Sequence, residues 1–224
     1  ALEVIGCEFC QVMGMTEAGG VVSYLPPADH LIEGPHAHRL ASAGRCTVGV
    51  ELEVREPGIG TPLPAGASGE LWFRTPFMAN HYIGRPEQTA KVFVDGWINS
   101  RDIGHVDADG YIYMEGRSDD MIITGGENVH PGEVEGVIAE LPDVVESAVF
   151  GVPDPLWGRK VAALVVSRSG NLDAAQVVEH CRGRLAGYKI PKTVVFLDEL
   201  PKTATGKIVR SALPDTLAAI EETA

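Results

Sequence analysis

The chain has 224 residues, long enough for one large domain or two small ones, and its 45% hydrophobic and 22% charged content is that of an ordinary globular protein. The formal net charge of −13 argues against a nucleic-acid partner, because nucleic-acid phosphates are bound by clustered Lys and Arg. No apolar run reaches about 18 residues, so the sequence predicts no transmembrane segment.

The cysteines and the first residues indicate where the protein works. Residues 1–20 lack a charged leading region and a small-residue cleavage site, so no signal peptide is predicted. Cys7 and Cys10 form a lone CxxC without a second pair, and Cys46 and Cys181 add no spacing typical of secreted scaffolds. We therefore expect reduced cysteines, no structural zinc site and a cytoplasmic location.

The first half of the chain is rich in strand patterns. Residues 7–13 are predicted to form a short buried strand that ends at Gly14, and alternating apolar residues predict a half-buried strand over 47–54. Asp109-Gly110 indicates a hairpin, and Pro86 begins a predicted short helix over 86–92. Further strands are expected at residues 70–74, near Trp97 and at 111–114. This half is therefore predicted to be a small antiparallel β-subdomain.

The second half alternates helices with strands. A helix is predicted over 131–141, and a second one from the N-cap residue Asp173 to Leu185. Strands are predicted at residues 144–152, 160–166 and 193–197. The predicted fold class is therefore α+β, with a boundary near Ser118-Asp119 between the β-subdomain and a compact α+β domain.

A lysine on a Gly-containing turn stands near the end of the sequence, in Thr205-Gly206-Lys207. An ammonium group there is a suitable point charge for a carboxylate and a phosphate held side by side. Seven basic and two acidic residues lie in the surrounding segment 182–210, which gives it a charge of +5. This segment is either a solvated basic face or a patch that receives the phosphates of a small anionic ligand.

Four more stretches stand upstream of this turn in a fixed order. They are Met13-Gly14-Met15-Thr16-Glu17, Ser100-Arg101-Asp102, Gly116-Arg117-Ser118-Asp119 and Gly125-Gly126-Glu127-Asn128. Together with the turn they resemble the adenylate-forming superfamily, which contains acyl-CoA synthetases, peptide-synthetase adenylation domains and luciferases. The resemblance runs over almost the whole chain and is greatest to bacterial fatty-acyl-CoA synthetases.

The resemblance implies an ATP/AMP site. Thr16 would bind a phosphate oxygen and Glu17 would bind Mg²⁺, although a Thr-Glu pair after a strand is also a common polar turn. Met13 stands where the family usually has an aromatic residue, so its thioether would pack on the adenine. Asp102 would accept hydrogen bonds from the ribose hydroxyls, and Arg117 would bind the ribose or a phosphate.

The resemblance also implies a catalytic lysine, a hinge and a coenzyme A tunnel. Lys207 would neutralise charge between the substrate carboxylate and the α-phosphate, and Asp119 would be the hinge between two domains. The glycine pair is explained equally well by a structural tight turn. The residues expected at the coenzyme A tunnel are Gly125, Gly126, Glu127 and Trp157.

The sequence also departs from the family pattern elsewhere. Ser100-Arg101-Asp102 stands where the family usually has Thr-Gly-Asp, and the Ser/Thr/Gly-rich phosphate loop that ends in Lys-Gly is absent. The resemblance therefore implies the C-terminal portion of a longer enzyme that is inactive by itself. Its expected domains are residues 1–118, the end of the large AMP-binding domain, and residues 119–224, a mobile C-terminal domain.

The expected function is that of an ATP-dependent acid–thiol ligase, an acyl-CoA synthetase. It would adenylate a carboxylic acid, a fatty acid by the resemblance, and pass the acyl group to coenzyme A. Two alternatives remain open. One is an acyl-AMP ligase that loads a carrier protein, and the other is a non-catalytic module that kept the fold.

Overall fold

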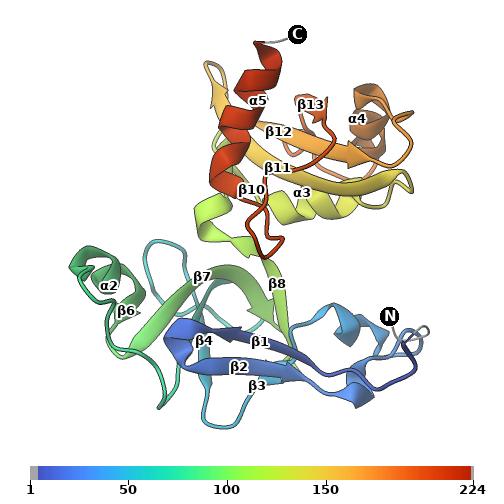
Figure 1. Cartoon of the computed structure of the whole chain (residues 1–224). Helices are drawn as coiled ribbons and strands as arrows, with labels where there is room; N and C mark the ends of the chain where they lie inside the picture. The colour runs from blue at the N-terminus through green and yellow to red at the C-terminus, as the bar shows by residue number, and fades with distance from the viewer. Residues whose placement is uncertain (1–4, 223–224) are drawn as a thin grey trace. The chain divides into compact units, whose positions relative to one another are not determined.

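A computed structural model describes residues 5–222 of the chain. The chain divides between Ser118 and Asp119 into two compact units, here called unit 1 and unit 2 (Figure 1). Both units combine antiparallel strands with few helices, so the predicted α+β class is confirmed. Within residues 5–222, no helix is long and apolar enough to cross a membrane.

Unit 1 is built on two antiparallel sheets. The larger sheet has the order β4-β5-β7-β6, with β8 also paired to β7, and the smaller has the order β1-β2-β3. Its strands are β4 (Glu51–Arg55), β5 (Gly69–Arg74), β6 (Phe93–Val94), β7 (Trp97–Val106) and β8 (Ile112–Arg117). The smaller sheet consists of β1 (Gln11–Met15), β2 (Gly20–Leu25) and β3 (Arg45–Cys46). Helix α2 (Pro86–Val92) and the 3-10 turns η1 (Thr16–Ala18), η2 (Pro27–Asp29) and η3 (Ala37–Ala41) connect them.

The core of unit 1 lies between these elements. Leu71 and Phe73 of β5, Ile98 of β7 and Ile112 of β8 are completely buried and pack in one cluster with Val22 of β2. Because residues two apart on a strand share a face, Leu71 and Phe73 point to the same side of β5. This cluster holds the smaller sheet against the larger one and fixes the strand ends that form the candidate site.

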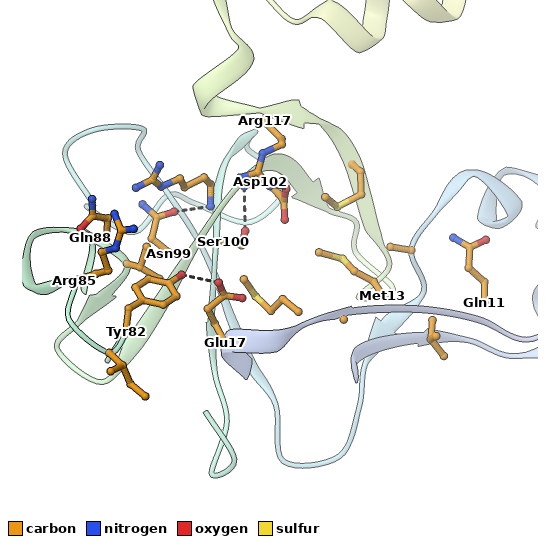
Figure 2. Close-up of a pocket in the computed structure, with 18 residues that line it drawn as sticks. Gln11, Met13, Glu17, Tyr82, Arg85, Gln88, Asn99, Ser100, Asp102 and Arg117 are labelled. Carbon is orange, nitrogen blue, oxygen red and sulfur yellow. Dashed lines mark hydrogen bonds and ion pairs between the residues drawn. The ribbon is translucent and has the colours of Figure 1, made fainter. Parts of the chain in front are cut away.

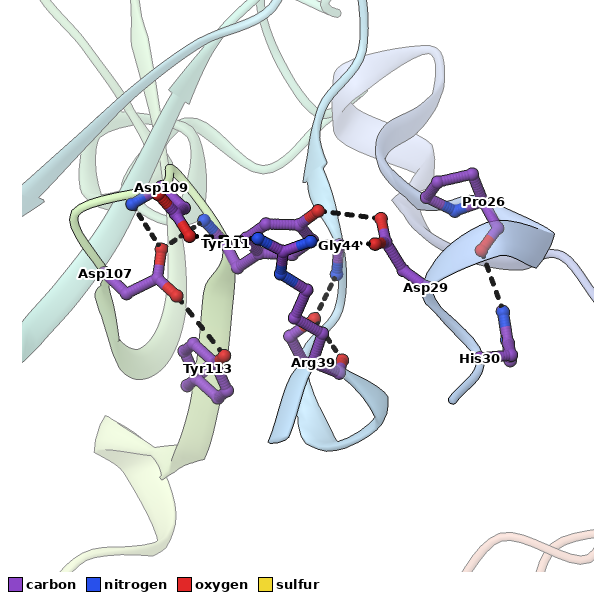
Figure 3. A network of polar contacts seen from close by, with 10 residues as sticks. Pro26, Asp29, His30, Arg39, Gly44, Asp107, Asp109, Tyr111 and Tyr113 are labelled. Atoms are coloured by element: carbon purple, nitrogen blue, oxygen red, sulfur yellow. Dashed lines mark hydrogen bonds and ion pairs between the residues drawn. The ribbon is translucent and has the colours of Figure 1, made fainter. Parts of the chain in front are cut away.

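A buried polar network also stabilises unit 1 (Figure 3). The Tyr111 hydroxyl donates to Asp29 Oδ2 at 2.7 Å, and Arg39 donates to Asp29 Oδ1 at 3.1 Å and to Asp109 Oδ2 at 3.0 Å. The guanidinium of Arg39 also lies 4.6 Å from the centroid of the Tyr111 ring. The hydrogen bond from Tyr111 lowers the pKa of Asp29 and outweighs the opposing effect of burial. This network fastens the η2–η3 segment to the β7–β8 hairpin.

Unit 2 is built on a three-stranded sheet with helices on both faces. The sheet has the order β11 (Val144–Asp154), β12 (Gly158–Ser167) and β13 (Thr193–Phe196); β11 is antiparallel and β13 parallel to β12. A hairpin of β9 (Ile122–Thr124) and β10 (Glu127–Val129) precedes it. The helical segments are α3 (Pro131–Ile138), α4 (Ala174–Arg182), η5 (Arg210–Ala212) and α5 (Leu213–Glu221), and the turn η4 (Ser118–Asp120) begins one residue before the division.

The central strand β12 is buried on both faces, which explains its nearly continuous apolar run. Val161, Ala163 and Val165 pack in the cluster that contains α3 and α4 residues. Ala162, Leu164 and Val166 pack in a second cluster that contains α5 residues. Unit 2 therefore has two apolar layers of its own, one on each side of the sheet.

Several local predictions are confirmed. Helix α2 spans Pro86–Val92 as expected, and Asp109-Gly110 lies in the turn between the antiparallel strands β7 and β8. Asp173 caps α4, because its carboxylate accepts from Gln176 N at 2.8 Å while the Gln176 side chain accepts from Asp173 N at 2.9 Å. Helix α4 ends at Arg182 rather than at the expected Leu185.

Two strand predictions are wrong in part. The strand expected at residues 7–13 is β1, which begins only at Gln11 and is largely exposed, because it lies at the edge of its sheet. The strand expected over 47–54 begins at Glu51, and Val48 is fully exposed in the preceding turn. Val48 therefore lies on the surface, whereas Val50, Leu52 and Val54 pack against the core of unit 1.

Candidate active site

A cavity of about 1050 Å³ in unit 1 is the candidate site (Figure 2). It lies where β1, η1, the segment around α2, β7 and β8 meet. Four residues predicted from the sequence line it: Met13, Glu17, Asp102 and Arg117. The structure thus brings together side chains from three separate sequence stretches.

An irregularity in β7 places Asp102 at the cavity. The pairing of β7 with β5 shifts register between Glu70 and Trp72, which leaves residues 100–102 bulged. The buried Ser100 hydroxyl donates to Leu71 O at 2.8 Å and accepts from Asp102 N at 3.1 Å. The bulge is therefore fixed by side-chain hydrogen bonds and turns the Asp102 carboxylate towards the cavity.

Arg101, at the centre of this bulge, has a φ of 59°. This left-handed conformation favours glycine, the residue that the family pattern usually has here, and costs another residue about 1–2 kcal/mol. Its N–H donates to Asn99 Oδ1 at 2.8 Å, and its carbonyl accepts from Ser118 Oγ at 3.2 Å. Asn99 Nδ2 donates in turn to the buried Glu70 at 3.0 Å, so the strained backbone is held from several sides.

Asp102 and Arg117 form an ion pair at the cavity wall, with Arg117 Nη1 2.9 Å from Asp102 Oδ1. The Asp102 side chain is 17% exposed and that of Arg117 47% exposed. Burial raises the pKa of Asp102, although the Arg117 charge and the hydrogen bonds from Ser100 and Arg117 act in the opposite direction. One half-buried carboxylate and a neighbouring guanidinium thus face the same space.

Glu17 lies across the cavity in η1, directly after β1. The Tyr82 hydroxyl donates to Glu17 Oε1 at 2.5 Å, and Ala79 N donates to the Glu17 carbonyl at 2.8 Å (Figure 2). Burial, and then the hydrogen bond to the carboxylate, raise the pKa of Tyr82 to about 12. The phenol therefore remains a proton donor at neutral pH.

The remaining residues of the first motif differ in their placement. Met13 is half-buried and lines the cavity, as a residue that packs on a planar ligand would. Thr16 is exposed at the start of η1 and is not among the residues that line the cavity. Its predicted role in binding a phosphate oxygen stays a prediction.

Two carboxylates line the cavity, Glu17 and Asp102, and that of Asp102 is paired with Arg117. Among residues 5–222, no group of three or more His, Cys, Asp or Glu side chains is arranged to hold an ion. Mg²⁺ in nucleotide sites is held by one or two carboxylates together with phosphate oxygens and water. The Glu17 carboxylate fits that pattern, and it would hold the ion jointly with a nucleotide.

In unit 2 the glycine pair forms the turn of the β9–β10 hairpin. Gly125 and Gly126 have φ values of 58° and 86°, as a two-residue type I′ turn requires, and Thr124 pairs with Glu127. Gly125 N donates to Trp157 O at 2.9 Å, and a Cβ on Gly125 would lie 2.7 Å from Trp157 Cε3. The glycine at 125 is therefore needed for the approach of the indole ring.

The Trp157 loop has its own anchor. Asp154 Oδ1 accepts from Leu156 N at 2.9 Å and from Trp157 N at 3.0 Å, and these backbone hydrogen bonds lower the pKa of Asp154. Leu156 is 80% exposed and Trp157 44% exposed. The structure thus brings Gly125, Gly126 and Trp157 together, with Glu127 exposed at the end of the same turn.

Lys207 lies in a tight turn after Leu200-Pro201-Lys202. Thr203 N donates to Lys207 O at 2.8 Å, and the Thr203 hydroxyl accepts from Lys207 N at 3.2 Å. Gly206 has a φ of 82°, which closes the turn. The Lys207 side chain is exposed, so its ammonium is available to a ligand.

Asp119 lies at the division between the two units, in η4. The next residue, Asp120, pairs with Arg210 at 3.2 Å. Arg210 also donates to both oxygens of Glu135 on α3 at 2.9 Å and to Val149 O on β11 at 3.1 Å. The segment just after Asp119 is therefore fixed within unit 2, while Asp119 itself is exposed.

Several cavity residues were not predicted from the sequence. They are Gln11, Tyr82, Arg85, Gln88, Asn99 and Met114, among others. Tyr82 is the most informative, because it contacts a predicted site residue. Its position shortly before the proline-initiated helix α2 was the available signal, but only the fold shows that this segment passes beside η1.

Comparisons with known proteins identify the family of the chain. Residues 1–83 match the family of AMP-binding enzymes, and residues 133–207 match the AMP-binding enzyme C-terminal domain. The chain belongs to the AMP-binding enzyme family. As a member of this family, it carries its two matched regions in the two units that the structure separates.

Several relatives of this AMP-binding family member are named as ligases. A fatty acid–[acyl-carrier-protein] ligase, ScoC, of Streptomyces coeruleorubidus is 40% identical over 96% of this chain and 41% of its own length. An indoleacetate–CoA ligase of Aromatoleum aromaticum is 42% identical over 91% of this chain and 39% of its own length. The ATP-bound crystal structure of MatB from Rhodopseudomonas palustris matches with a TM-score of 0.85 and 36% identity, over 96% of this chain and 42% of that one. The chain thus spans about two-fifths of the length of these curated relatives.

Proposed function

We propose that the chain forms part of an ATP-dependent acid–thiol ligase and that the unit 1 cavity binds the nucleotide. The observation that carries this proposal is the convergence of Met13, Glu17, Asp102 and Arg117 on one cavity. Family membership supports it, because relatives of this chain are named as acid ligases and a similar structure contains ATP.

Each of these side chains suits one part of a nucleotide. The half-buried Asp102 carboxylate accepts hydrogen bonds from the two vicinal ribose hydroxyls, and Arg117 fixes its orientation through the 2.9 Å ion pair. The Met13 thioether packs on the adenine face. Glu17 would hold Mg²⁺ together with the polyphosphate, and the bound ion would supply charge neutralisation when pyrophosphate leaves.

Lys207 supplies a positive charge for the reacting carboxylate and α-phosphate. In the first half-reaction a carboxylate oxygen attacks the α-phosphorus, and the bond to pyrophosphate breaks. The exposed ammonium of Lys207 stabilises the negative charge shared by the carboxylate and the α-phosphate. In the second half-reaction a thiol attacks the acyl carbonyl and AMP leaves, and the surface of Gly125 and Trp157 binds the pantetheine arm of coenzyme A.

The two half-reactions need different groups near one adenylate. We propose that unit 2 is a mobile domain and that the chain bends at Asp119 between the steps, because Asp119 lies at the division of the units. Hinge residues are few and lie in loops or at the ends of elements, and Asp119 lies in the short turn η4 that connects β8 to β9.

The acid and the acceptor are finer proposals. We propose a fatty acid, coenzyme A and a cytoplasmic reaction. A carrier-protein acceptor is the second candidate, because a relative 40% identical to this chain is named as a fatty acid–[acyl-carrier-protein] ligase. The exposed Trp157 beside Gly125 offers an apolar surface to a pantetheine arm, which both candidate acceptors carry.

The test is acid-dependent exchange of pyrophosphate into ATP by the full-length protein, with a panel of carboxylic acids of different chain length. Fatty acids are expected to give the fastest exchange, and added coenzyme A is expected to yield the thioester. A protein that binds ATP but shows no exchange with any acid would be a non-catalytic module. Thioester formation only on a carrier protein would favour the second candidate.

A further inference from the structure

The Glu17 carboxylate is held in one orientation by a residue that the motifs do not contain. Glu17 Oε1 accepts from the Tyr82 hydroxyl at 2.5 Å, while the Glu17 carbonyl accepts from Ala79 N at 2.8 Å. Figure 2 shows the phenol and the carboxylate facing one another inside the cavity. Two hydrogen bonds from one segment, residues 79–82, therefore fix both the backbone and the side chain of Glu17.

Tyr82 is itself fixed by its neighbours. Its ring packs edge-on against Phe93, with centroids 5.3 Å apart and an angle of 63° between the rings. Its N–H donates to Thr89 Oγ1 at 2.9 Å, which ties it to α2. A phenol held at its ring and at its backbone has a defined position for its hydroxyl, so the hydrogen bond to Glu17 is preorganised.

This arrangement divides the two oxygens of Glu17 between different tasks. Oε1 is occupied by the phenol, whereas the part of the chain between residues 5 and 222 provides no hydrogen bond to Oε2. Glu17 lines the cavity, so Oε2 is the oxygen that remains for a ligand. The hydrogen bond fixes the plane of the carboxylate, so the group presents Oε2 to the cavity in a fixed direction.

We propose that Tyr82 is a positioning residue that orients Glu17 Oε2 towards the divalent cation bound with the nucleotide polyphosphate. The inference rests on the proposed nucleotide site and adds to it a residue outside the recognised motifs. Groups that hydrogen-bond to metal ligands contribute about 10–100-fold to metal affinity. A purely structural link between η1 and α2 would instead contribute to folding stability and leave metal affinity unchanged.

The test compares Tyr82→Phe with the full-length wild-type protein. Mn²⁺ affinity is measured by electron paramagnetic resonance in the presence of α,β-methylene-ATP, and the Mg²⁺ concentration for half-maximal pyrophosphate exchange is measured in parallel. Tyr82→Phe is expected to lower the Mn²⁺ affinity by about 10–100-fold and to raise the required Mg²⁺ concentration by a similar factor. Excess Mg²⁺ should restore most of the exchange rate. Tyr113→Phe is the matched control, because its hydroxyl bonds to Asp107 at 3.3 Å, outside the cavity.

A second variant separates positioning from folding. If Tyr82 acts through Glu17, then Tyr82→Phe should cause no further loss of Mn²⁺ affinity in a Glu17→Gln background, since the oxygen that it orients is gone. Equal losses in both backgrounds, or a lowered melting temperature with unchanged Mn²⁺ affinity, would overturn the proposal. Absence of acid-dependent exchange in the wild-type protein would instead refute the proposed function, because Mn²⁺ binding with the nucleotide analogue is read independently of the acid.

Discussion

At the scale of single residues, the site depends on one half-buried carboxylate. Asp102 is 17% exposed and its pKa is raised by burial, so its charged form is less favourable in the folded protein than in the unfolded chain. An acid whose pKa rises on folding adds to the free energy of unfolding when it is protonated, and this contribution is greatest at low pH. That contribution is lost as the pH rises through the raised pKa. A carboxylate that lowers stability at neutral pH and lies at a cavity wall is consistent with a ligand-binding role for Asp102.

Asp102→Asn is therefore expected to separate stability from binding. At neutral pH the variant should be as stable as the wild type or more so, and the difference should vanish near pH 3. Its KM for ATP should rise by about 10–100-fold, because hydrogen bonds to a charged acceptor contribute about 1.5–3 kcal/mol. Thermal denaturation from pH 3 to 8 and exchange kinetics measure the two effects. Asp95→Asn, at an exposed turn, is the control and should change neither.

At the scale of elements, the β9–β10 turn shows why two adjacent glycines are not equivalent. Both have positive φ, but a Cβ would meet the Trp157 ring at Gly125 and open space at Gly126. Backbone strain therefore applies at both positions, while steric overlap applies only at Gly125. The two positions offer a matched pair of substitutions.

We expect Gly126→Ala to destabilise unit 2 by about 1 kcal/mol, from the left-handed backbone alone. Gly125→Ala should cost about 2–4 kcal/mol, because the Trp157 ring must also move. It should also slow thioester formation more than adenylation, since the displaced ring forms the proposed pantetheine surface. Urea unfolding and hydrogen exchange of the hairpin amides measure the first effect. Equal costs at the two positions would show that the ring contact is unimportant.

Elements that are defined by local chemistry could be predicted from the sequence. Pro86 marks the start of α2, Asp173 caps α4, and Asp109-Gly110 turns between β7 and β8. Helix α5 was missed, since its inward face rests on little more than Leu213 and Leu217. Strand β1 was predicted too early and as buried, because an edge strand and a core strand share the same short apolar pattern.

Only those site residues that belong to the sequence motifs could be predicted. Met13, Glu17, Asp102 and Arg117 follow from the resemblance and converge on one cavity. Tyr82 could not be predicted, because its role depends on a hydrogen bond across 65 residues. Nor could the backbone of Arg101 be predicted, since its φ of 59° results from a bulge that Asn99 and Ser100 hold in place.

At the scale of the whole molecule, the chain divides at Ser118/Asp119, where we propose the hinge of a two-step reaction. Asp119→Pro should restrict rotation there, because proline fixes φ near −65°, a value that the 3-10 turn η4 already tolerates. In the full-length protein, adenylation should stay within a factor of about three while thioester formation falls by about tenfold or more. Asp119→Ala, which keeps the rotation, is the control. Similar losses in both half-reactions would count against a hinge.

The central claim is that this chain carries the charge that adenylation requires, and Lys207 tests it most directly. Single-turnover kinetics of each half-reaction should be compared for wild-type and Lys207→Ala full-length protein. We expect adenylation to slow by about 10²–10³-fold, the effect of losing one electrostatic stabiliser. Thiolysis of a supplied acyl-adenylate and the melting temperature should change little, because the side chain is exposed. Adenylation at the wild-type rate would contradict the account and make Lys207 an ordinary surface residue.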